Sequence, residues 1–521
     1  MQISLEMRDT PLDDTDELRE IFRDHTLTGI FQTATWQYHR YCINCKLSGS
    51  VYAASEIEGA VPIIHGPSGC AFHQRLTPMR LYAPVYKLPC TNLDENDVIY
   101  GGESKLRDKV LEVYRRYKPS LILLLPTCVS GLIGDDISGI SQDLKAQLPC
   151  SIIPIASEGF AHRSRESLDG LMQESAKSWK TSRAPDYEIR GCGQEEVMVS
   201  LVEQLMEEQD VVDKQVNIES FGRFRYGSQV DLREIKRIFN EIGIGINTTL
   251  LNCTVDDIKR APAAELNIIT RNRKAGKLMN TKFGTGYFRK WASHYGLDGI
   301  EKFFVEVGSK LGLEGEAEEI IQREKRQAME ELERYRKTFS KFEFAVSAQG
   351  FFFTPYIASI YARDLRLPLK YFCVSTQLLR SMNTSEKTIK MMIDNMQDVF
   401  DDWDFGFETV VNPSLDEMAE MAKGVDYLLS DRITPLIYGN RMMDVSAVSH
   451  LLFRTSFSGI VEFSRYLARN LHNGISEPSG DLILSKFHYD QLNYPIIEDP
   501  RCSASREMWS DMWSLGSAGG D

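Results

Sequence analysis

Three cysteines in the N-terminal third of the sequence lie where a thiol can bind metal. Cys70 follows the apolar run VPIIHG, and Cys128 follows the apolar run SLILLLP, each in a loop that contains glycine. Cys45 lies 25 residues before Cys70, and Cys128 lies 58 residues after it. Ligands of open α/β sheets bind beyond the carboxyl ends of the strands, and glycine lets the backbone approach a bulky group closely. A metal cluster could therefore bind between these loops.

The residue types leave three interpretations of these thiols open. Free cysteines are often small buried hydrophobic residues, which gives them no role beyond the core. A structural zinc site is the second interpretation, since Cys42 and Cys45 form a CxxC pair, although such a site would want a second close pair of ligands. Thiolates also suit iron-sulfur clusters, whose ligands need not come in pairs. Cys90 is a further thiol in the same region.

The elements that position these cysteines are predicted by an alternation of apolar runs, turns and amphipathic stretches from residue 61 onward. This alternation indicates βαβ units and parallel sheets. A chain of 521 residues is too long for one ordinary core. We therefore expect an α/β fold with three Rossmann-like domains and mainly parallel sheets.

The predicted domains differ in what they contain. The first is an α/β domain with the cysteine loops, and it holds strands at 61–66, 120–126 and 151–156. The second contains a stretch from Glu314 to Phe339 with helical period and many charges, which predicts one long, largely solvated helix. The boundaries that we predict are 1–45 for an N-terminal extension, 46–212, 213–340 and 341–475 for the three domains, and 476–521 for a C-terminal extension.

The composition narrows the class of protein. The chain has 42% apolar and 26% charged residues, and no run approaches the roughly 18 to 20 apolar residues that a membrane span requires. The acidic N-terminus lacks the layout of a secretory signal, so we expect a cytoplasmic location and no membrane partner. The net charge of -14 argues against nucleic acid as a partner. Because disulfides rarely persist in the cytoplasm, the ten cysteines are expected to be free to bind metal.

Several segments, in the right order, resemble the nitrogenase component 1 superfamily. The stretch from Cys45 to Cys70, CKLSGSVYAASEIEGAVPIIHGPSGC, is similar to the segment of the nitrogenase β subunit that holds its first two P-cluster cysteines. PTCVSGLIGDDI resembles the segment that carries the third, and CTNLDENDVIYGGESKL resembles the segment between them. The pattern of three successive α/β domains also suits this superfamily.

The resemblance implies that Cys45, Cys70 and Cys128 are ligands of an iron-sulfur cluster. The cluster would be P-cluster-like with eight irons, or an interfacial 4Fe-4S cluster, and a partner subunit would supply matching thiolates. Cys42 and Cys90 are weaker candidates. His65 and His73 flank the Cys70 loop and could donate hydrogen bonds or protons, but we expect structural roles for both.

Ligation of an active-site cofactor by this chain is not expected. The nitrogenase α subunit uses a cysteine that follows a strand like ELNII, and this chain has Thr270 and Arg271 at that point. Cys253 and His450 could substitute, but a buried cysteine and a hydrogen-bonded structural histidine are the preferred interpretations.

Two further departures concern the surroundings of the cluster. The stretch AFHQRLTPMRLYAPVYKL after Cys70 does not resemble the corresponding stretch of true nitrogenase β subunits, which disfavours dinitrogen as substrate. The serine that β-type subunits place near a cluster has no clear counterpart, because SEGFAHRSRES has Arg163 close to that point and Ser164 beside it.

The resemblance implies an oxidoreductase: the iron-sulfur, β-type subunit of the catalytic component of a two-component, ATP-dependent nitrogenase-like reductase. A separate reductase iron protein would hydrolyse ATP and deliver electrons, since this sequence has no GxxxxGK[ST] phosphate loop. A homologous α-type subunit would complete an α2β2 heterotetramer that reduces a small molecule, with methylthio-alkanes the preferred class. The alternatives are a scaffold for maturation of a nitrogenase-type cofactor, nitrogenase proper, a reductive cyclase of a nickel tetrapyrrole, and a zinc-stabilised binding module without a redox role.

Overall fold

The structure is a computed structural model. It describes most of the chain from Cys45, the first candidate ligand, to Asn473, near the end of the third predicted domain. The residues that it describes are 45–80, 88–159, 165–181, 192–219, 228–250, 252–270, 273–349, 355–376, 379–380, 384–413, 415–430, 442–445 and 449–473.

The first sheet consists of three parallel strands in sequence order: β2 (Ala60–His65), β3 (Leu121–Pro126) and β4 (Ser151–Pro154). Every residue of β3 is buried, because helices cover both faces of the sheet. Leu121, Leu123 and Leu125 pack on one face with α4 (Lys46–Ser55) and α11 (Gly193–Gln204). Ile122 and Leu124 pack on the other with α7 (Glu103–Tyr117) and α9 (Ile137–Lys145).

Two further parallel sheets follow along the chain. The second has the order β6-β5-β8-β9, and the third has the order β12-β11-β10-β13-β14. Their strands are β5 (Val212–Ile218), β6 (Gly245–Thr248), β8 (Ala264–Ile269), β9 (Gly286–Arg289), β10 (Phe344–Gln349), β11 (Leu369–Ser375), β12 (Glu408–Val411), β13 (Tyr427–Ser430) and β14 (Met442–Asp444). Every strand pair described is parallel, as the alternating sequence pattern predicts.

The remaining helices connect and cover the sheets. In chain order they are α5 (Ser68–Arg80), α6 (Glu95–Tyr100), α8 (Cys128–Ile133), α10 (Arg165–Thr181), α12 (Ser228–Ile242), α13 (Val255–Lys259), η2 (Ala261–Ala263), α14 (Arg273–Phe283), η3 (Ala292–His294), α15 (Gly296–Lys310), α16 (Glu314–Phe339), α17 (Pro355–Ser359), the π-helix η5 (Ile360–Asp364), α19 (Glu386–Asp402), α20 (Leu415–Lys423), η7 (Ser449–Phe453) and α22 (Ser458–Asn473). Helix α16 has the bounds expected from the sequence.

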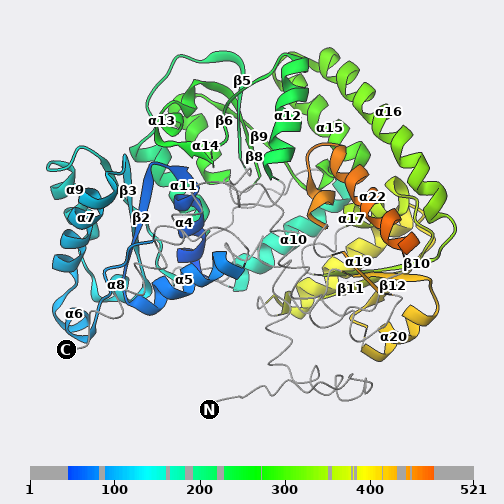
Figure 1. Cartoon of the computed structure of the whole chain (residues 1–521), viewed down its shortest axis with the longest axis horizontal. Coiled ribbons are helices and arrows are strands. Elements are labelled where there is room, and N and C mark those ends of the chain that lie inside the picture. The colour runs from blue at the N-terminus through cyan, green and yellow to red at the C-terminus, as the bar shows by residue number, and fades with distance from the viewer. Residues whose placement is uncertain are drawn as a thin grey trace.

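The three sheets and their helices form an arch, with the second sheet between the first and the third (Figure 1). Helix α10 runs from the first part of the arch to the third, where it packs along α19. Lys180 of α10 pairs with Asp398 of α19 at 2.6 Å. The first sheet is also tied to the second part, because the two-residue strand β1 (Ile57–Glu58) pairs in parallel with β7 (Cys253–Thr254).

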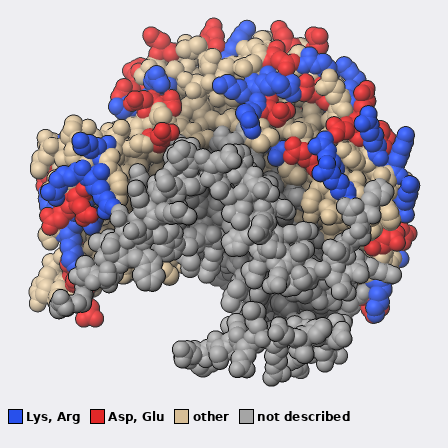
Figure 2. Space-filling model, in the orientation of Figure 1, with Lys and Arg blue, Asp and Glu red and all other residues tan. Residues whose placement is uncertain are grey.

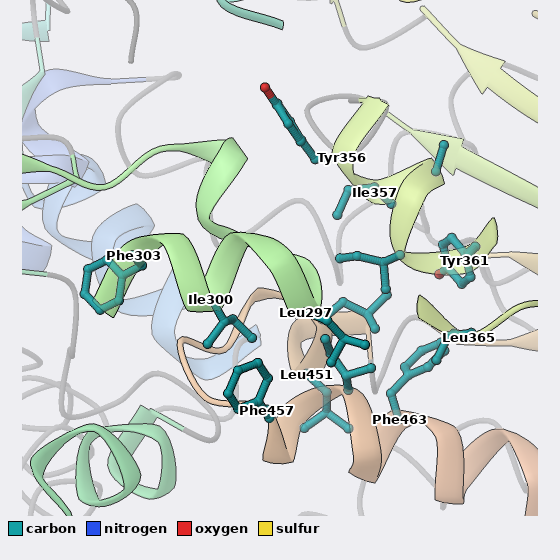
Figure 3. Close-up of a cluster of buried hydrophobic side chains, with 14 of the residues drawn as sticks. Leu297, Ile300, Phe303, Tyr356, Ile357, Tyr361, Leu365, Leu451, Phe457 and Phe463 are labelled. Atoms are coloured by element: carbon teal, nitrogen blue, oxygen red, sulfur yellow. The ribbon is translucent and has the colours of Figure 1, made fainter. Parts of the chain in front are cut away.

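The largest buried core joins the second and third parts of the chain. Figure 3 shows side chains of α15, α17, η5 and α22 meeting in this core. Phe303 and Phe463, which lie on α15 and α22, are almost completely buried. Burying this apolar surface is the main force that holds the two parts together.

Charged side chains of both signs intermingle over α12 and α16 on the face that Figure 2 shows. There Arg237 of α12 pairs with Glu324 of α16 at 2.5 Å, and Arg323 of α16 pairs with Glu241 of α12. These ion pairs join α12 to α16. No helix among the described residues is long and apolar enough to cross a membrane.

The α/β fold with Rossmann-like, parallel-sheet domains is confirmed. The first sheet and its cysteine loops lie within 46–212, the strands of the third lie within 341–475, and β5 of the second begins at Val212, at the boundary of 213–340. The domain boundaries themselves stay a prediction.

Candidate metal centre

Cys45 is held at the start of a tightly packed helix. It is the N-cap residue of α4, with an extended backbone, and its carbonyl accepts a hydrogen bond from Ser48 N at 3.0 Å. Helix α11 fixes this end of α4, because a Cβ at Gly193 would lie only 1.8 Å from Lys46 O. Ser50 Oγ donates to Gly193 O at 3.2 Å. The close approach of α11 therefore sets where the Cys45 thiol lies.

Cys70 and Cys128 follow two neighbouring strands whose ends are bonded together. Cys70 lies in the first turn of α5, after β2, and Cys128 is the first residue of α8, after β3. The carbonyl of His65, the last residue of β2, accepts from Thr127 N at 3.0 Å and from Ser130 Oγ at 2.7 Å. These bonds bring the loop before Cys70 and the start of α8 to the same edge of the sheet.

A glycine after the third strand meets two of the thiols. A Cβ at Gly159 would lie 3.0 Å from Cys128 Sγ and 3.1 Å from Cys45 Sγ. The two sulfurs therefore lie close to the same point, although the two cysteines are 83 residues apart in the sequence. Only glycine leaves this space open.

The third thiol, that of Cys70, is influenced by the charges of the other two. Burial raises the pKa of Cys70, and repulsion by the thiolates of Cys45, Cys128 and Cys90 raises that pKa further. Mutual repulsion of this kind is relieved when a cation binds, because metal ligation requires the thiols to be deprotonated. The sequence predicts that Cys45, Cys70 and Cys128 come together. The structure places the sulfurs of Cys45 and Cys128 beside Gly159, with Cys70 near enough to be influenced by their charges. Their role as ligands stays a prediction.

The group is not arranged around one ion. In the part of the chain that the structure describes, no three His, Cys, Asp or Glu side chains converge closely enough to hold a single metal ion. Cys42, the other half of the CxxC pair on which the zinc interpretation rests, lies outside the described residues. A cluster of several metal ions suits the three thiols, because each thiolate can then bind a different ion and a second chain can supply the rest.

Cys90 has partners of its own. It is buried, its Sγ lies 3.3 Å from Gly66 O as a donor, and it accepts from Asn92 N at 3.4 Å. Burial raises the pKa of this thiol. Cys90 therefore ties its loop to the residue after β2 and is a neighbour of the thiol group.

His65 is completely buried behind the Cys70 loop. Its Nε2 lies 2.8 Å from Asp135 Oδ2, and its Nδ1 lies 3.1 Å from Thr91 Oγ1. Asp135 was missed as a partner, although it stands in the IGDD segment quoted for the family resemblance. His73 is exposed on α5.

The other candidates do not join the thiol group. Cys253 is buried in β7, opposite Ile57, as the core interpretation predicted. Strand β8 ends at Ile269 as expected, and Thr270 N after it donates to Glu219 Oε2 at 2.8 Å. Several positions lie outside what the structure describes, namely Cys42, Arg163, Ser164, Arg271 and the side chain of His450.

An apolar patch lies on the helices that carry or adjoin the thiols. Helix α6 contacts α8, and both present large apolar side chains to solvent. Phe72 stands two residues after Cys70, and Leu132 stands four residues after Cys128. The members of the apolar patch are Phe72, Val98, Ile99, Tyr100 and Leu132, with exposed fractions of 65%, 44%, 70%, 84% and 77%. Exposed apolar surface that is contiguous marks an interaction site, and four of these five side chains lie on α6 and α8, which are in contact.

Known proteins resemble this chain in sequence. The family model of nitrogenase component 1 type oxidoreductases matches residues 45–424. A nitrogenase molybdenum-iron protein alpha chain of Methanosarcina barkeri is 27% identical over 314 residues, which are 57% of this chain and 53% of that protein. The nitrogenase iron-molybdenum cofactor biosynthesis protein NifE of Methanococcus maripaludis is 28% identical over 310 residues, which are 57% of this chain and 58% of that protein.

A solved structure supports the fold. The structure titled "Nitrogenase Cp1 at pH 6.5" superposes with a TM-score of 0.54 at 16% identity, and covers 84% of this chain and 91% of its own. The aligned part spans little more than half of the length of the two relatives above.

Proposed function

Because the chain belongs to the nitrogenase component 1 type oxidoreductase family, we propose that it is an iron-sulfur subunit of the catalytic component of a nitrogenase-like reductase. In this proposal it takes electrons from an ATP-hydrolysing iron protein and relays them towards a site that reduces a small molecule. Cys45, Cys70 and Cys128 hold the cluster.

The observation that carries this proposal is the meeting of three thiols from three separate loops. Gly159 leaves a cradle that a Cβ would fill, between Cys45 Sγ and Cys128 Sγ. Cys70 lies near enough to both thiols for their charges to raise its pKa, after the larger effect of burial. A donor set of thiolates alone suits iron-sulfur chemistry.

The chain prepares these thiols for metal. Cys45 and Cys70 lie at the starts of α4 and α5, where the helix dipole stabilises a negative charge. Bonds from Thr127 and Ser130 to the His65 carbonyl hold two of the loops at a fixed spacing. When bound, an iron-sulfur cluster supplies the capacity to accept and pass on single electrons.

The apolar patch supports a protein partner at this site. Its members lie on α5, α6 and α8, and α5 and α8 carry Cys70 and Cys128, so a protein docked there would bring its own redox group close to the thiols. We propose that the electron-delivering iron protein contacts this patch. A homologous subunit that shares the cluster would lie against the thiols themselves.

The proposal also covers the type of subunit and the class of substrate. The named relatives are alpha chains and NifE proteins, whereas the segments around the cysteines resemble β subunits. Thr270 stands where an α subunit has its cofactor cysteine, which supports an electron-relay role over cofactor ligation. We propose an α2β2 assembly, and methylthio-alkanes as the substrate class to test first.

The test is the iron and acid-labile sulfide content of protein purified without oxygen, with electron paramagnetic resonance of the same samples. The wild-type chain should contain iron and sulfide, and Cys70→Ala should lose most of both. Cys150→Ala is the matched control, since Cys150 is partly buried on the first sheet but is not among the groups that influence Cys70. Iron and sulfide near zero in the wild type, or unchanged in Cys70→Ala, would contradict the proposal.

A maturation scaffold is the second candidate, because NifE proteins stand among the relatives. A scaffold holds a cluster precursor and releases it to another protein without turning over a substrate. Transfer of radiolabelled iron to an acceptor protein, with no ATP-dependent reduction when all partners are present, would favour the scaffold. Turnover with retained iron would favour the reductase.

A further inference from the structure

A buried histidine-carboxylate pair lies directly behind the cysteine loops. The ring of His65 has no exposed surface, and Asp135 has a side-chain exposure of 3%. The imidazole is bonded on both nitrogens, to Asp135 Oδ2 at 2.8 Å and to Thr91 Oγ1 at 3.1 Å. Gly102 closes over the ring, because a Cβ there would lie 3.1 Å from His65 Cε1. A packed core does not require such a polar pair, since burying a charge is costly.

The pair is connected to the loops that carry the thiols. The His65 carbonyl accepts from Thr127, the residue before Cys128, and Gly66 N donates to Thr91 Oγ1 at 3.0 Å. Asp135 lies seven residues after Cys128, at the end of the loop that follows α8. The backbone of His65 is therefore hydrogen-bonded to the loop that carries Cys128, whereas its imidazole is bonded to Asp135 and Thr91.

The charges that face the imidazole come from three elements. Asp135 comes from the loop before α9, Asp97 from α6 and Glu103 from the start of α7, and all three favour the protonated ring. Lys105 offsets part of this effect, because it pairs with Asp97 at 2.6 Å. Burial nevertheless prevails and lowers the pKa of His65 below its ordinary value of 6.5. At neutral pH the imidazole is therefore mostly neutral, and it is hydrogen-bonded to the side chain of Asp135.

We propose that His65 and Asp135 form a proton-holding pair that is coupled to the electron content of the thiol site. When a one-electron protein donor reduces the site, the imidazole takes one proton from solvent, and it releases that proton when the electron leaves. Electron and proton together leave the net charge of this buried region unchanged. The inference rests on the proposed function, and it makes the pair a positioning and charge-compensating element, not a ligand.

The direction of the coupling follows from electrostatics. Added negative charge at the thiol site raises the pKa of a nearby histidine, because it stabilises the protonated form. The ring starts with a lowered pKa, so reduction can carry it from mostly neutral to mostly protonated. Asp135 is the group that stabilises the imidazolium once it forms, through the hydrogen bond at 2.8 Å.

The test measures the midpoint potential of the site at several pH values in the loaded complex. Between the two pKa values of His65, each pH unit changes the reduction equilibrium tenfold, which is about 59 mV for one electron. We expect this slope in the wild type and a nearly flat profile in His65→Gln. Asp135→Asn removes the partner carboxylate, so the sloping part of its profile should move to lower pH.

His294→Gln is the matched control. His294 is also buried and lowered in pKa by burial, and its Nε2 lies 3.0 Å from Glu306 Oε2, but it belongs to the second part of the chain. This variant should keep the wild-type slope.

Proton uptake on reduction of the wild type in unbuffered solution provides a second measurement, which does not depend on any variant folding. A wild-type potential that is independent of pH, an unchanged slope in iron-loaded His65→Gln, or no proton uptake would overturn the inference alone. A wild type without iron and sulfide would instead remove the proposed function, and this inference with it.

Discussion

Replacing Gly159 by alanine would place a methyl group between two of the proposed ligands. The new carbon would lie 3.0 Å from Cys128 Sγ and 3.1 Å from Cys45 Sγ, whereas nonbonded heavy atoms pack at about 3.5–4.0 Å. Both sulfurs would have to retreat by roughly 0.5 Å. Gly159 is not among the glycines with positive φ, so alanine adds a steric contact without backbone strain.

The two consequences of this substitution differ in size. The chain can absorb the methyl group at about 1 kcal/mol, the low end for overpacking, because both contacts are the ends of side chains. For a chain of 521 residues this corresponds to a fall in Tm of about 1 °C. Metal-ligand distances tolerate only about 0.2 Å, so the displaced sulfurs should lower iron affinity by roughly tenfold or more, an effect comparable with losing an outer-shell partner.

The assay compares iron and sulfide content and Tm in Gly159→Ala and Gly315→Ala. Gly315 lies on α16, and a Cβ there meets nothing within 4 Å, so the control should keep both wild-type values. Wild-type iron content and an unchanged resonance spectrum in Gly159→Ala would refute the location of the site. A large fall in Tm would contradict the expectation that the substitution weakens iron binding much more than it destabilises the fold.

Four further outcomes are expected. Gly193→Ala should lower Tm strongly, because its Cβ would lie 1.8 Å from Lys46 O. Thermal unfolding measures this effect. A wild-type Tm in this variant would contradict the packing of α11 on α4. Iron affinity should rise by about tenfold per pH unit for each thiol proton released, since burial and neighbouring thiolates raise the pKa of Cys70. Iron titrations at pH 6 to 8 check this, and an iron affinity that does not change with pH would count against it. Burial raises the pKa of Asp364 to about 7 from 3.8, so the free energy of unfolding should fall as pH rises through that window, by up to about 4 kcal/mol. Asp364→Asn should remove this dependence in denaturant titrations. Tyr100→Asp, in the apolar patch, should slow reduction by the iron protein roughly tenfold at unchanged iron content; stopped-flow reduction at the wild-type rate would exclude the patch as the contact.

The strands and the cysteine loops could be predicted because local pattern determines them. The run LILLLP is buried on both faces, which is typical of a central parallel strand, and it became β3. Cys70 and Cys128 follow neighbouring parallel strands, so their loops had to share one edge of the sheet. The bounds of α16 followed from its helical period and its charges.

Other parts of the site depend on contacts that no local pattern encodes. Gly159 matters only because it lies beside Cys45 and Cys128, which stand at the starts of α4 and α8 in distant parts of the sequence. Asp135 is hydrophilic and stands in a turn, yet the close approach of Gly102 buries it. The π-helix η5 could not be predicted from the sequence either. Its last residue, Asp364, accepts hydrogen bonds from Leu297 N and from Arg336, which lie on other elements.

The pairing of β1 with β7 sets an order of events during synthesis. Ile57 and Glu58 leave the ribosome long before their partners Cys253 and Thr254 exist. At about 5–20 residues per second, the interval of roughly 200 residues is on the order of 10 s or more. During this interval α4 and Cys45 lack their tether to the second part of the chain. A metal that bound to the proposed site during synthesis would therefore meet an unfinished site.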